Sequence, residues 1–325
     1  MQPFNYVHAD DEARAIAAGA TRGAQFIAGG TNVVDLLRLE VIRPDSIVDI
    51  TALPLREVSV VGKAVKIGAL VRNSDLAYHP VIVERFPVLA EALLAGASPQ
   101  LRNMATVGGN LLQRTRCAYF RDGVSLCNKR ALGTGCAARE GYIRMYAILG
   151  ISDHCIAAYP SDMATALVAL DAIVHTHGPN GTRAIPVTEL HTLPGAHPEI
   201  ETVLQPGELI THVELPATAF AARSRYVKVR DRASFAFALA SAAVALELRD
   251  ATIRDARIAL GGVATKPWRA RDAERMLAGK APSTAAFRDA ADAALVGATP
   301  IGDNAFKVEL AKRTLVRALQ RAGAP

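Results

Sequence analysis

A chain of 325 residues can bury a sizeable core and is expected to form two or three domains. Half of its residues are hydrophobic and 21% are charged, which is typical of globular proteins and excludes a disordered chain. No apolar run approaches the roughly 18 residues of a membrane span. Met1–Asn5 lacks the basic and apolar regions of a secretory signal, so export would depend on a partner.

The positive charge of the chain is concentrated in one stretch. The formal net charge is +6. A basic patch often binds nucleic acid, but this one coincides with the cysteines and has few aromatic residues beyond Tyr119 and Phe120, so no nucleic-acid partner is expected. The stretch contains eight basic and two acidic residues: Arg102, Arg114, Arg116, Arg121, Lys129, Arg130, Arg139 and Arg144, with Asp122 and Glu140.

The first 50 residues predict an α/β unit. Strands are expected at 4–7, 24–28 and 46–50, and helices at 10–18 and 33–39, the first with Asp10 as its N-cap. The glycine pair at 29–30 is expected to connect the second strand to the second helix. Such alternation of strands and helices favours parallel pairing.

The middle of the chain predicts two hairpins and several helices. The first hairpin pairs 58–61 with 64–67, and helices follow from Asn73 and at 88–94. After a loop-like segment that contains the cysteines, a strand is expected at 156–159 and a helix from its cap Ser161 to about 170. The second hairpin pairs 172–176 with 183–187, with His175 and His177 pointing outward; 191–207 is a surface loop and 209–215 a strand.

A domain boundary is predicted near 217–223. Beyond it, strands are expected at 224–230, 236–249 and 256–260, and helices at 269–277, 285–295 and 304–321. This part therefore predicts an α+β domain with a three-stranded sheet backed by helices.

All four cysteines of the chain fall within 39 residues: Cys117, Cys127, Cys136 and Cys155. Their spacing matches neither a C-x-x-C zinc knuckle nor the cysteine run of a ferredoxin. Four thiolates suit an iron–sulfur cluster or a structural zinc ion. Two disulfides, or four unrelated buried cysteines, are the alternatives.

The basic residues around the cysteines favour the iron–sulfur interpretation. An iron–sulfur cluster with four thiolates is negatively charged, so neighbouring cations would stabilise it and raise its reduction potential. The same cations would lower the pKa of the thiols. A solvated basic face is the competing explanation.

Two glycine turns have similar flanking residues. Phe26–Asn32 reads FIAGGTN and Ala105–Leu111 reads ATVGGNL. Turns of this kind let successive backbone N–H groups face one anion such as a pyrophosphate. Neither turn has the Rossmann or Walker pattern. Two further residues are candidates for binding: Asp162, beside the helix cap Ser161, and Lys228, which alone would be an exposed strand lysine.

Together these motifs resemble the FAD-binding subunits of the xanthine dehydrogenase family of molybdenum hydroxylases. The resemblance spans the whole chain and includes the two turns, Ser161-Asp162, the KVRDRASFAFA segment from Lys228 and the ALGGVATKPWR run at 259–269. The cysteine region resembles that of the flavin subunits of periplasmic aldehyde oxidoreductases, through RTRCAYF, CNKR and GCAA. This resemblance implies an α+β chain with a two-part FAD-binding domain of the vanillyl-alcohol-oxidase/PCMH type. The implied parts are 1–52, 53–220 with a [4Fe-4S] insertion at about 112–156, and a C-terminal flavoprotein domain at 221–325.

The resemblance also implies roles for individual residues. The backbone of the first turn would hold the FAD pyrophosphate, Asp162 would bind a cofactor hydroxyl, Lys228 would lie near the flavin ring or its ribityl chain, and the four cysteines would bind a [4Fe-4S] cluster. The implied FAD-binding residues are Phe26, Ile27, Ala28, Gly29, Gly30, Thr31, Asn32, Val33, Val34, Thr106, Gly109, Asn110, Asp162 and Lys228.

The partners implied are a large molybdenum-cofactor subunit and a small subunit with two [2Fe-2S] clusters, forming a heterotrimer. This chain would not oxidise the aldehyde itself but would pass electrons through FAD to an external acceptor, for example a ferredoxin-like protein. A periplasmic location with a signal-bearing partner is implied, with the cytoplasm as the alternative. The competing functions are a benzoyl-CoA-type reductase flavin subunit and, in another class, a zinc-stabilised binding protein.

Overall fold

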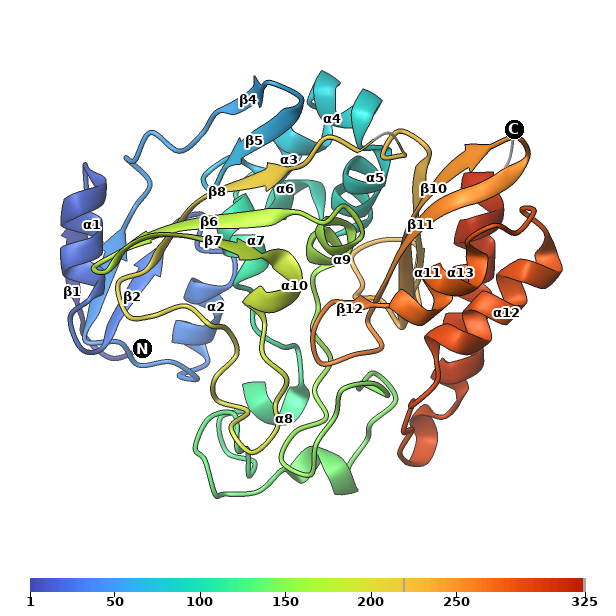
Figure 1. Ribbon diagram of the computed structural model, residues 1–325. Coiled ribbons are helices and arrows are strands. Elements are labelled where there is room, and N and C mark those ends of the chain that lie inside the picture. Colours follow the sequence, from blue (N-terminus) through green and yellow to red (C-terminus); the bar gives the residue numbers. More distant parts are fainter. Residues whose placement is uncertain (219, 324–325) are drawn as a thin grey trace.

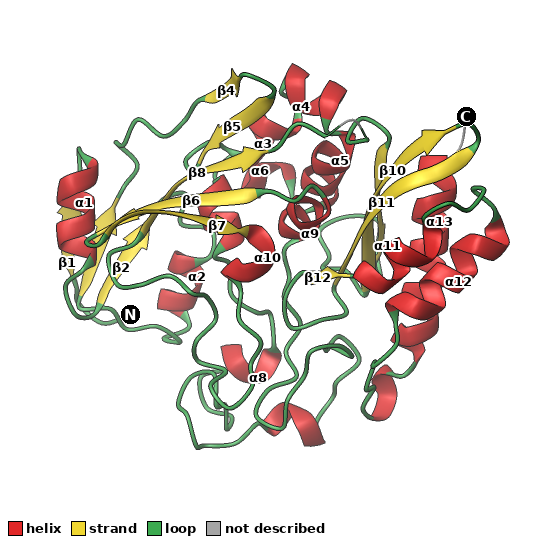
Figure 2. Ribbon diagram, in the orientation of Figure 1, coloured by secondary structure: helices red, strands yellow, loops and turns green. Residues whose placement is uncertain are grey.

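The computed structural model describes residues 1–218 and 220–323 and contains three β-sheets (Figures 1 and 2). Residue 219, within the predicted boundary at 217–223, lies outside the described residues. The predicted domain limits stay a prediction.

The N-terminal sheet is parallel, as expected. Its strand order is β1 (Asn5–His8), β3 (Ser46–Asp49), β2 (Ala24–Ile27), and helices α1 (Glu12–Gly19) and α2 (Val33–Arg38) connect the strands. The expected cap Asp10 is wrong by one residue, since the carboxylate of Asp11 accepts from the backbone N–H of Arg14 at 2.8 Å. Asp10 instead precedes the cap and lies 3.4 Å from the Arg14 guanidinium.

The second sheet has five antiparallel strands, in the order β4 (Val58–Val61), β5 (Ala64–Gly68), β8 (Leu209–Leu215), β6 (Ile173–Gly178), β7 (Gly181–Pro186). Ile67 and Val174 are buried on its inner face, while His175 and His177 are half-buried on the outer face, as predicted. The inner face packs against helices. The helices that contribute to the core beneath it are α3 (Asn73–Ala77), α4 (Pro80–Arg85), α5 (Pro87–Ala95), α7 (Val107–Leu111), α9 (Asp162–Ala169) and α10 (Val187–Leu190). The short helix α6 (Pro99–Arg102) follows α5 and has no buried residues.

The C-terminal sheet has four strands where three were expected. The order is β12 (Trp268–Arg269), β11 (Thr252–Gly261), β10 (Ala240–Arg249), β9 (Ser224–Val229), and the short strand β12 was predicted as the start of a helix. Strand β10 also begins at Ala240, not at residue 236. The helices that cover this sheet are α11 (Arg271–Leu277), α12 (Thr284–Ala294) and α13 (Phe306–Gly323), with the 3₁₀ turn η2 (Gly302–Asn304) before the last.

Both faces of β10 are buried because the sheet lies between two sets of helices. Ala243 belongs to the core shared with α5 and α9, whereas Val244 and Leu246 belong to the core shared with α11–α13. A strand buried on both faces reads as a continuous apolar run, which is why the sequence predicted it. None of the helices in the described chain has the length and hydropathy needed to cross a membrane.

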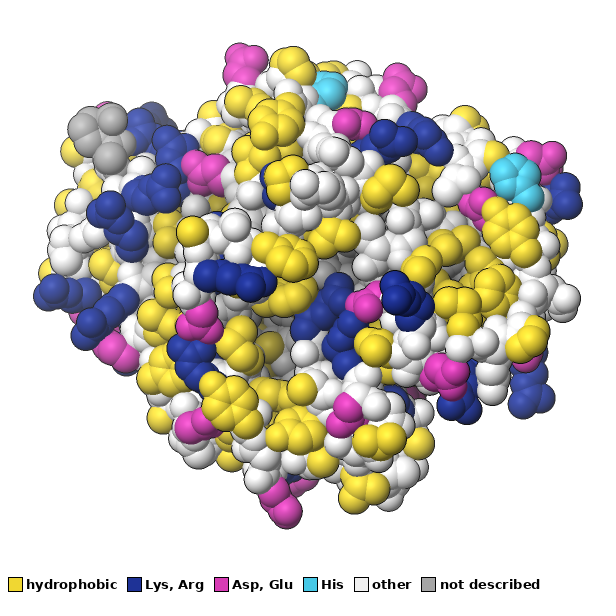
Figure 3. Space-filling model, turned by 180° about the vertical axis from the view of Figure 1, so that it is seen from behind, with side chains coloured by type: hydrophobic (Ala, Val, Ile, Leu, Met, Phe, Trp, Pro, Cys, Tyr) yellow, Lys and Arg dark blue, Asp and Glu magenta, His cyan; other side chains and the backbone are white. Residues whose placement is uncertain are grey.

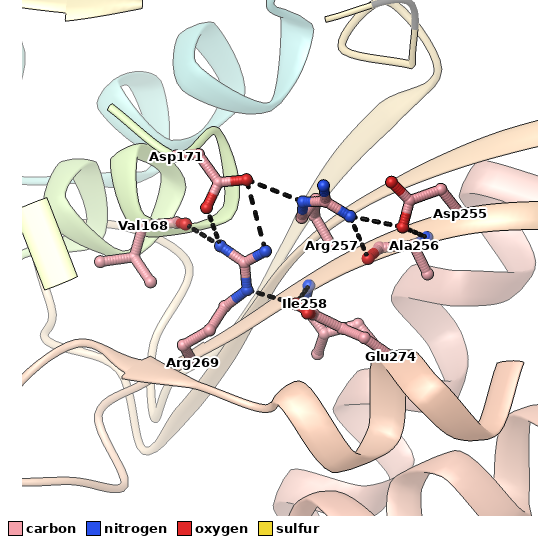
Figure 4. A network of polar contacts seen from close by, with 8 residues as sticks. All are labelled: Val168, Asp171, Asp255, Ala256, Arg257, Ile258, Arg269 and Glu274. Atoms are coloured by element: carbon pink, nitrogen blue, oxygen red, sulfur yellow. Dashed lines mark hydrogen bonds and ion pairs between the residues drawn. The ribbon is translucent and has the colours of Figure 1, made fainter. Parts of the chain in front are cut away.

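An ionic network connects α9 to the C-terminal sheet (Figure 4). The carboxylate of Asp171 accepts from Nη1 of Arg269 at 2.6 Å and from Nε of Arg257 at 2.7 Å. Arg269 also pairs with Glu274 of α11. Burial alone would raise the pKa of Asp171, but the two guanidinium groups outweigh burial and lower it. Helix α9 is thereby fixed to the C-terminal sheet, and its first residues line the candidate site.

Residues 112–156, the cysteine segment, lie together at the bottom of Figure 1. Apart from α8 (Ala118–Arg121) and η1 (Ala137–Glu140), the segment is irregular and has a small core of its own that includes Ile143, Tyr146 and Ile156. The strand expected at 156–159 is wrong. Within the described chain these residues belong to no sheet, although Tyr159 N–H donates to the carbonyl of Ala264 and the Ile156 carbonyl accepts from Ala147 N–H.

Candidate functional site

The two glycine turns lie against each other. A Cβ atom on Gly29 would lie 1.8 Å from the carbonyl oxygen of Met104, so the first turn touches the chain that leads into the second. Gly30 has a φ of +71°, a conformation that side-chain-bearing residues rarely adopt. In the second turn, a Cβ atom on Gly108 would lie 3.2 Å from the Cβ atom of Ala69, so this glycine is also closely packed. The turns, whose corresponding residues are 79 positions apart in the sequence, therefore form one site, which we call the cradle (residues 26–32 and 105–111).

Gly109 differs from Gly29 and Gly108 because it faces open space. Its only near neighbour would be the hydroxyl of Thr106, 3.0 Å from an added Cβ. That hydroxyl caps α7 by accepting from the backbone N–H of Gly109 at 3.3 Å. Gly109 thus leaves space for a ligand to approach the backbone, although its own N–H donates to Thr106.

Two cavities meet at the cradle. The large cavity, of about 370 Å³, and the turn cavity, of about 160 Å³, share Thr31, Asn32 and Gly109. Of the predicted FAD-binding residues, Ile27, Val34 and Lys228 line neither cavity. The predicted residues that line one or both are Phe26, Ala28, Gly29, Gly30, Thr31, Asn32, Val33, Thr106, Gly109, Asn110 and Asp162.

The cavities offer free hydrogen-bond donors and positive charge. Within the described chain, the backbone N–H groups of residues 29–32 donate to no protein acceptor. The buried Oδ1 atoms of Asn32 and Asn73 also have no partner. Arg102, Arg116 and Arg232 line the large cavity, and Figure 3 shows Lys and Arg side chains around a hollow near the middle of the rear face. Buried polar groups normally have partners, so the free N–H donors and the arginines fit an anionic diphosphate, and the two free Oδ1 acceptors fit hydroxyl or N–H groups of the same ligand.

The start of α9 joins the second turn to the C-terminal sheet. Ser161 caps the helix, as predicted, by accepting from Ala164 N–H at 3.0 Å, and its hydroxyl lies 2.6 Å from Oδ1 of Asn110. The carboxylate of Asp162 lies at the large cavity and accepts from Lys228 Nζ at 2.7 Å. Lys228 lies behind Asp162 and also donates to the carbonyl of Ala95 at 3.0 Å. Its predicted place near the flavin stays a prediction.

Sequence reasoning missed several residues of the large cavity. Asn73 had been assigned only to a helix start, and Arg102 and Arg116 only to a basic stretch. Phe237 had been placed inside a strand, but it precedes β10 and lines the cavity instead. Of these residues, Arg116 could have been singled out from the sequence, because it directly precedes the first cysteine.

The four cysteines line one small cavity, the thiol cavity, of about 10 Å³. Cys127 and Cys136 face each other across an antiparallel bridge. All four are free thiols, so the alternative of two disulfides is not what the structure contains. The hydroxyl of Tyr146 donates to Sγ of Cys117 at 3.1 Å.

Burial dominates the thiols. It raises the pKa of Cys117, and it raises that of Cys155 to about 11 even though Lys129 acts in the opposite direction. The expectation that basic residues lower the thiol pKa is therefore wrong for Cys117 and Cys155, because burial outweighs the neighbouring cations. Most of these cations are also paired with other groups. Arg130, for example, donates to the carbonyls of Tyr119 and Phe120 at 2.7 Å.

The basic stretch is not a solvated face either. Each of its members has a partner in the described structure. Arg114 and Lys129 pair with Glu201, Arg116 and Arg121 with Asp35, and Arg144 with Asp231, while Arg102, Arg130 and Arg139 donate to backbone carbonyls.

The thiols are not arranged around a single metal ion. Among residues 1–218 and 220–323, no group of three or more His, Cys, Asp or Glu side chains is placed to hold one. A zinc site needs its thiolates close together around one ion. In a four-iron cluster each thiolate binds a different iron, so the donor chemistry of four thiols at one cavity fits such a cluster.

A third cavity, the connecting cavity, of about 150 Å³, lies between the two predicted sites. It shares Cys117 and Tyr146 with the thiol cavity. It also shares Arg116, Asp162 and Phe237 with the large cavity. The cradle and the thiols are therefore neighbours, separated by residues 115–117 and 145–146.

Two family models together match nearly the whole chain. The model for the FAD binding domain in molybdopterin dehydrogenase matches residues 2–218. The model for the CO dehydrogenase flavoprotein C-terminal domain matches residues 225–322.

Known proteins resemble the chain along its full length. The aldehyde oxidoreductase FAD-binding subunit PaoB of Escherichia coli is 47% identical, covering 100% of this chain and 99% of that protein. The carbon monoxide dehydrogenase medium chain of Hydrogenophaga pseudoflava is 28% identical, covering 96% and 94%. The solved structure of carbon monoxide dehydrogenase from that organism matches with a TM-score of 0.77 at 28% identity, over 99% of this chain and 98% of the other. The chain therefore belongs to the FAD-binding medium subunits of the xanthine dehydrogenase and CO dehydrogenase family.

Proposed function

We propose that this chain is the FAD- and [4Fe-4S]-carrying subunit of a molybdenum-dependent aldehyde oxidoreductase. The observation that carries the proposal is the 47% identity, over the whole chain, with the FAD-binding subunit of an aldehyde oxidoreductase. The cavities at the cradle support it, since they fit a diphosphate-containing cofactor.

The residues of the chain bind and orient the cofactor. The free N–H groups of residues 29–32 and the open backbone at Gly109 hold the pyrophosphate, and Asp162, fixed by Lys228, accepts from a cofactor hydroxyl. FAD supplies redox chemistry in steps of one or two electrons, and so links single-electron carriers to a terminal acceptor.

The four cysteines are the proposed ligands of the [4Fe-4S] cluster. Their free thiols line one cavity, and four thiolates are the usual ligand set of such clusters. The cavity lies beside the connecting cavity, so a cluster at this place would be next to the flavin site.

The proposed partners are a molybdenum-cofactor large subunit, which oxidises the aldehyde, and a small [2Fe-2S] subunit, in a heterotrimer. This chain then receives electrons from the small subunit and passes them to an external acceptor, for which a ferredoxin-like protein is suited. A periplasmic location, reached with a signal-bearing partner, completes the proposal.

The test is purification under anaerobic conditions with whatever subunits accompany the chain. The proposal predicts flavin, about four irons on this chain in addition to those of a partner, molybdenum in the complex, and bleaching of the flavin absorbance by an aldehyde. A complex that contains flavin but is not reduced by any aldehyde, or a chain that contains zinc in place of iron, would refute it. Cell fractionation tests the location.

A further inference from the structure

Arg116 lies where the cysteine segment meets the flavin site. It precedes Cys117 and lines both the large and the connecting cavity. Its guanidinium group stacks over the ring of Phe237, 5.2 Å from the centroid. The side chain is 24% exposed, and Thr31 and Asn32 of the cradle line the same large cavity.

The charge of Arg116 is only partly balanced by the protein. Oδ2 of Asp35, in α2, accepts from Nη1 of Arg116 at 3.2 Å and also from Arg121. One carboxylate thus serves two guanidinium groups. In the described chain no other acceptor contacts Arg116, and its buried Nε has no partner. An uncompensated charge with unpaired donors is costly in a partly buried place, and an anion beside it removes that cost.

We propose that Arg116 is an FAD-binding residue whose guanidinium group contacts the negatively charged pyrophosphate held by the cradle. Charge-assisted contacts between guanidinium groups and phosphates are among the stronger hydrogen bonds in proteins. The cysteine segment thereby contributes directly to the flavin site. The inference rests on FAD binding and not on the [4Fe-4S] cluster, whose presence is measured separately by iron content.

Asp35 provides a test that separates this role from a structural one. Arg116→Gln and Asp35→Asn break the same ion pair, but only the first removes a group from the cavity. Each variant is purified with its partner subunits, its flavin is removed, and FAD is titrated back while its fluorescence quenching is followed. We expect Arg116→Gln to weaken FAD binding roughly ten- to one-hundred-fold, and Asp35→Asn to stay within about threefold of the unaltered protein.

Arg121→Gln is the matched control, because Arg121 shares Asp35 yet lines none of the three cavities. Equal losses in Arg116→Gln, Asp35→Asn and Arg121→Gln would overturn the proposal, as would unchanged binding by Arg116→Gln. Should Arg116→Gln not fold, Arg116→Lys replaces it, since an ammonium group keeps the charge without the planar fork. Weaker FAD binding by Arg116→Lys, with Arg121→Lys unchanged, supports the contact, and equal affinities in both overturn it.

Discussion

The cradle and the cysteine segment are both irregular backbone, but different interactions hold them in place. In the cradle, hydrogen bonds and close contacts between backbone atoms hold the two turns in place. Val107 N–H donates to Val71 at 3.0 Å, Gly108 N–H to Ala69 at 2.8 Å, and Gly29 touches the carbonyl of Met104. Small residues make this close contact possible.

In the cysteine segment, cationic side chains take the place of neighbouring strands. Arg130 donates to the carbonyls of Tyr119 and Phe120, and Lys307 of α13 donates to the carbonyls of Tyr146 and Gly262 at 2.8 and 2.6 Å. Buried carbonyls need donors, and a segment without strands obtains them from Lys and Arg. The comparison shows that much of the basic excess in this stretch has a structural role.

The largest expected effect is the loss of iron from the cysteine segment while the cradle keeps its flavin. Cys136→Ser should lose the [4Fe-4S] signal while FAD remains bound, because Cys136 lines the thiol cavity and neither cavity of the cradle. Iron and flavin content, with electron paramagnetic resonance of the reduced protein, check this. Four irons retained on the chain would refute ligation by Cys136, and loss of FAD would show that the two regions are not independent.

Gly29→Ala is expected to have the opposite effect to Cys136→Ser, because it alters the cradle and leaves the cysteine segment unchanged. Its Cβ would lie 1.8 Å from the Met104 carbonyl oxygen, so the turns must separate, at a cost of about 3 kcal/mol or more. We expect FAD to be lost and iron to be retained, as measured by cofactor content and thermal unfolding. Gly62→Ala is the control: it has a φ of +61° but no atom within 4 Å, and it should lose about 1 kcal/mol and keep FAD.

Lys307 provides a test that depends on pH. Burial lowers the pKa of Lys307 to about 7 from 10.5, so between these values the unfolded state binds more protons and the free energy of unfolding rises with pH. The rise should reach a few kcal/mol, at about 1.4 for each unit of pKa shift.

Denaturant unfolding at pH 7 and pH 9 measures this contribution. The rise should be smaller in Lys307→Met and preserved in Lys312→Met, which alters a partly exposed lysine of the same helix. If Lys307 fastens only the cysteine segment, hydrogen exchange in Lys307→Met should increase at 142–148 and stay unchanged in the cradle. Faster exchange in both regions would contradict the separation.

The smallest expected effect is a change in reduction potential caused by Tyr146, which lies between the cradle and the thiols. Tyr146→Phe removes the hydroxyl that donates to Cys117, and a hydrogen bond to a ligating sulfur raises a cluster's reduction potential. We expect the midpoint potential of the cluster to fall by roughly 20–60 mV. Tyr119→Phe is the control, since the hydroxyl of Tyr119 accepts from Tyr142 N–H and contacts no sulfur. Redox titrations that give the same shift for both variants would contradict the role of the hydroxyl.

The sequence predicted those elements of the fold that depend mainly on neighbouring residues in the chain. Ser161 caps a helix wherever that helix packs, and the apolar run of β10 is buried on both faces, so both were predicted from neighbouring residues. The strand expected at 156–159 was wrong because an apolar run forms a strand only where a partner strand pairs with it, and in the described chain single backbone contacts with Ala147 and Ala264 take the place of such pairing. Strand β12 was missed because two residues carry almost no pattern.

In the candidate site, too, features set by neighbouring residues were predicted and those set by distant partners were not. The glycine turns were predicted because two of them share similar flanking residues and resemble a known family, and the clustering of cysteines indicated that they would meet. The partners of charged residues were not predictable, since Arg116 finds Asp35 81 residues away and Lys228 finds Asp162 66 residues away. Such pairs depend on the folded arrangement and leave no periodic trace in the sequence.

The fastening of the cysteine segment has a consequence for the order of assembly. Its contacts reach Asp35, Glu201 and Asp231, and Lys307 joins it across 161 residues. Contacts that close such long loops form late in folding. Because Lys307 lies in α13, the segment gains its full set of contacts only once this helix has packed against it. The arrangement of the four thiols is therefore completed late in folding, after the elements on both sides of the segment have formed.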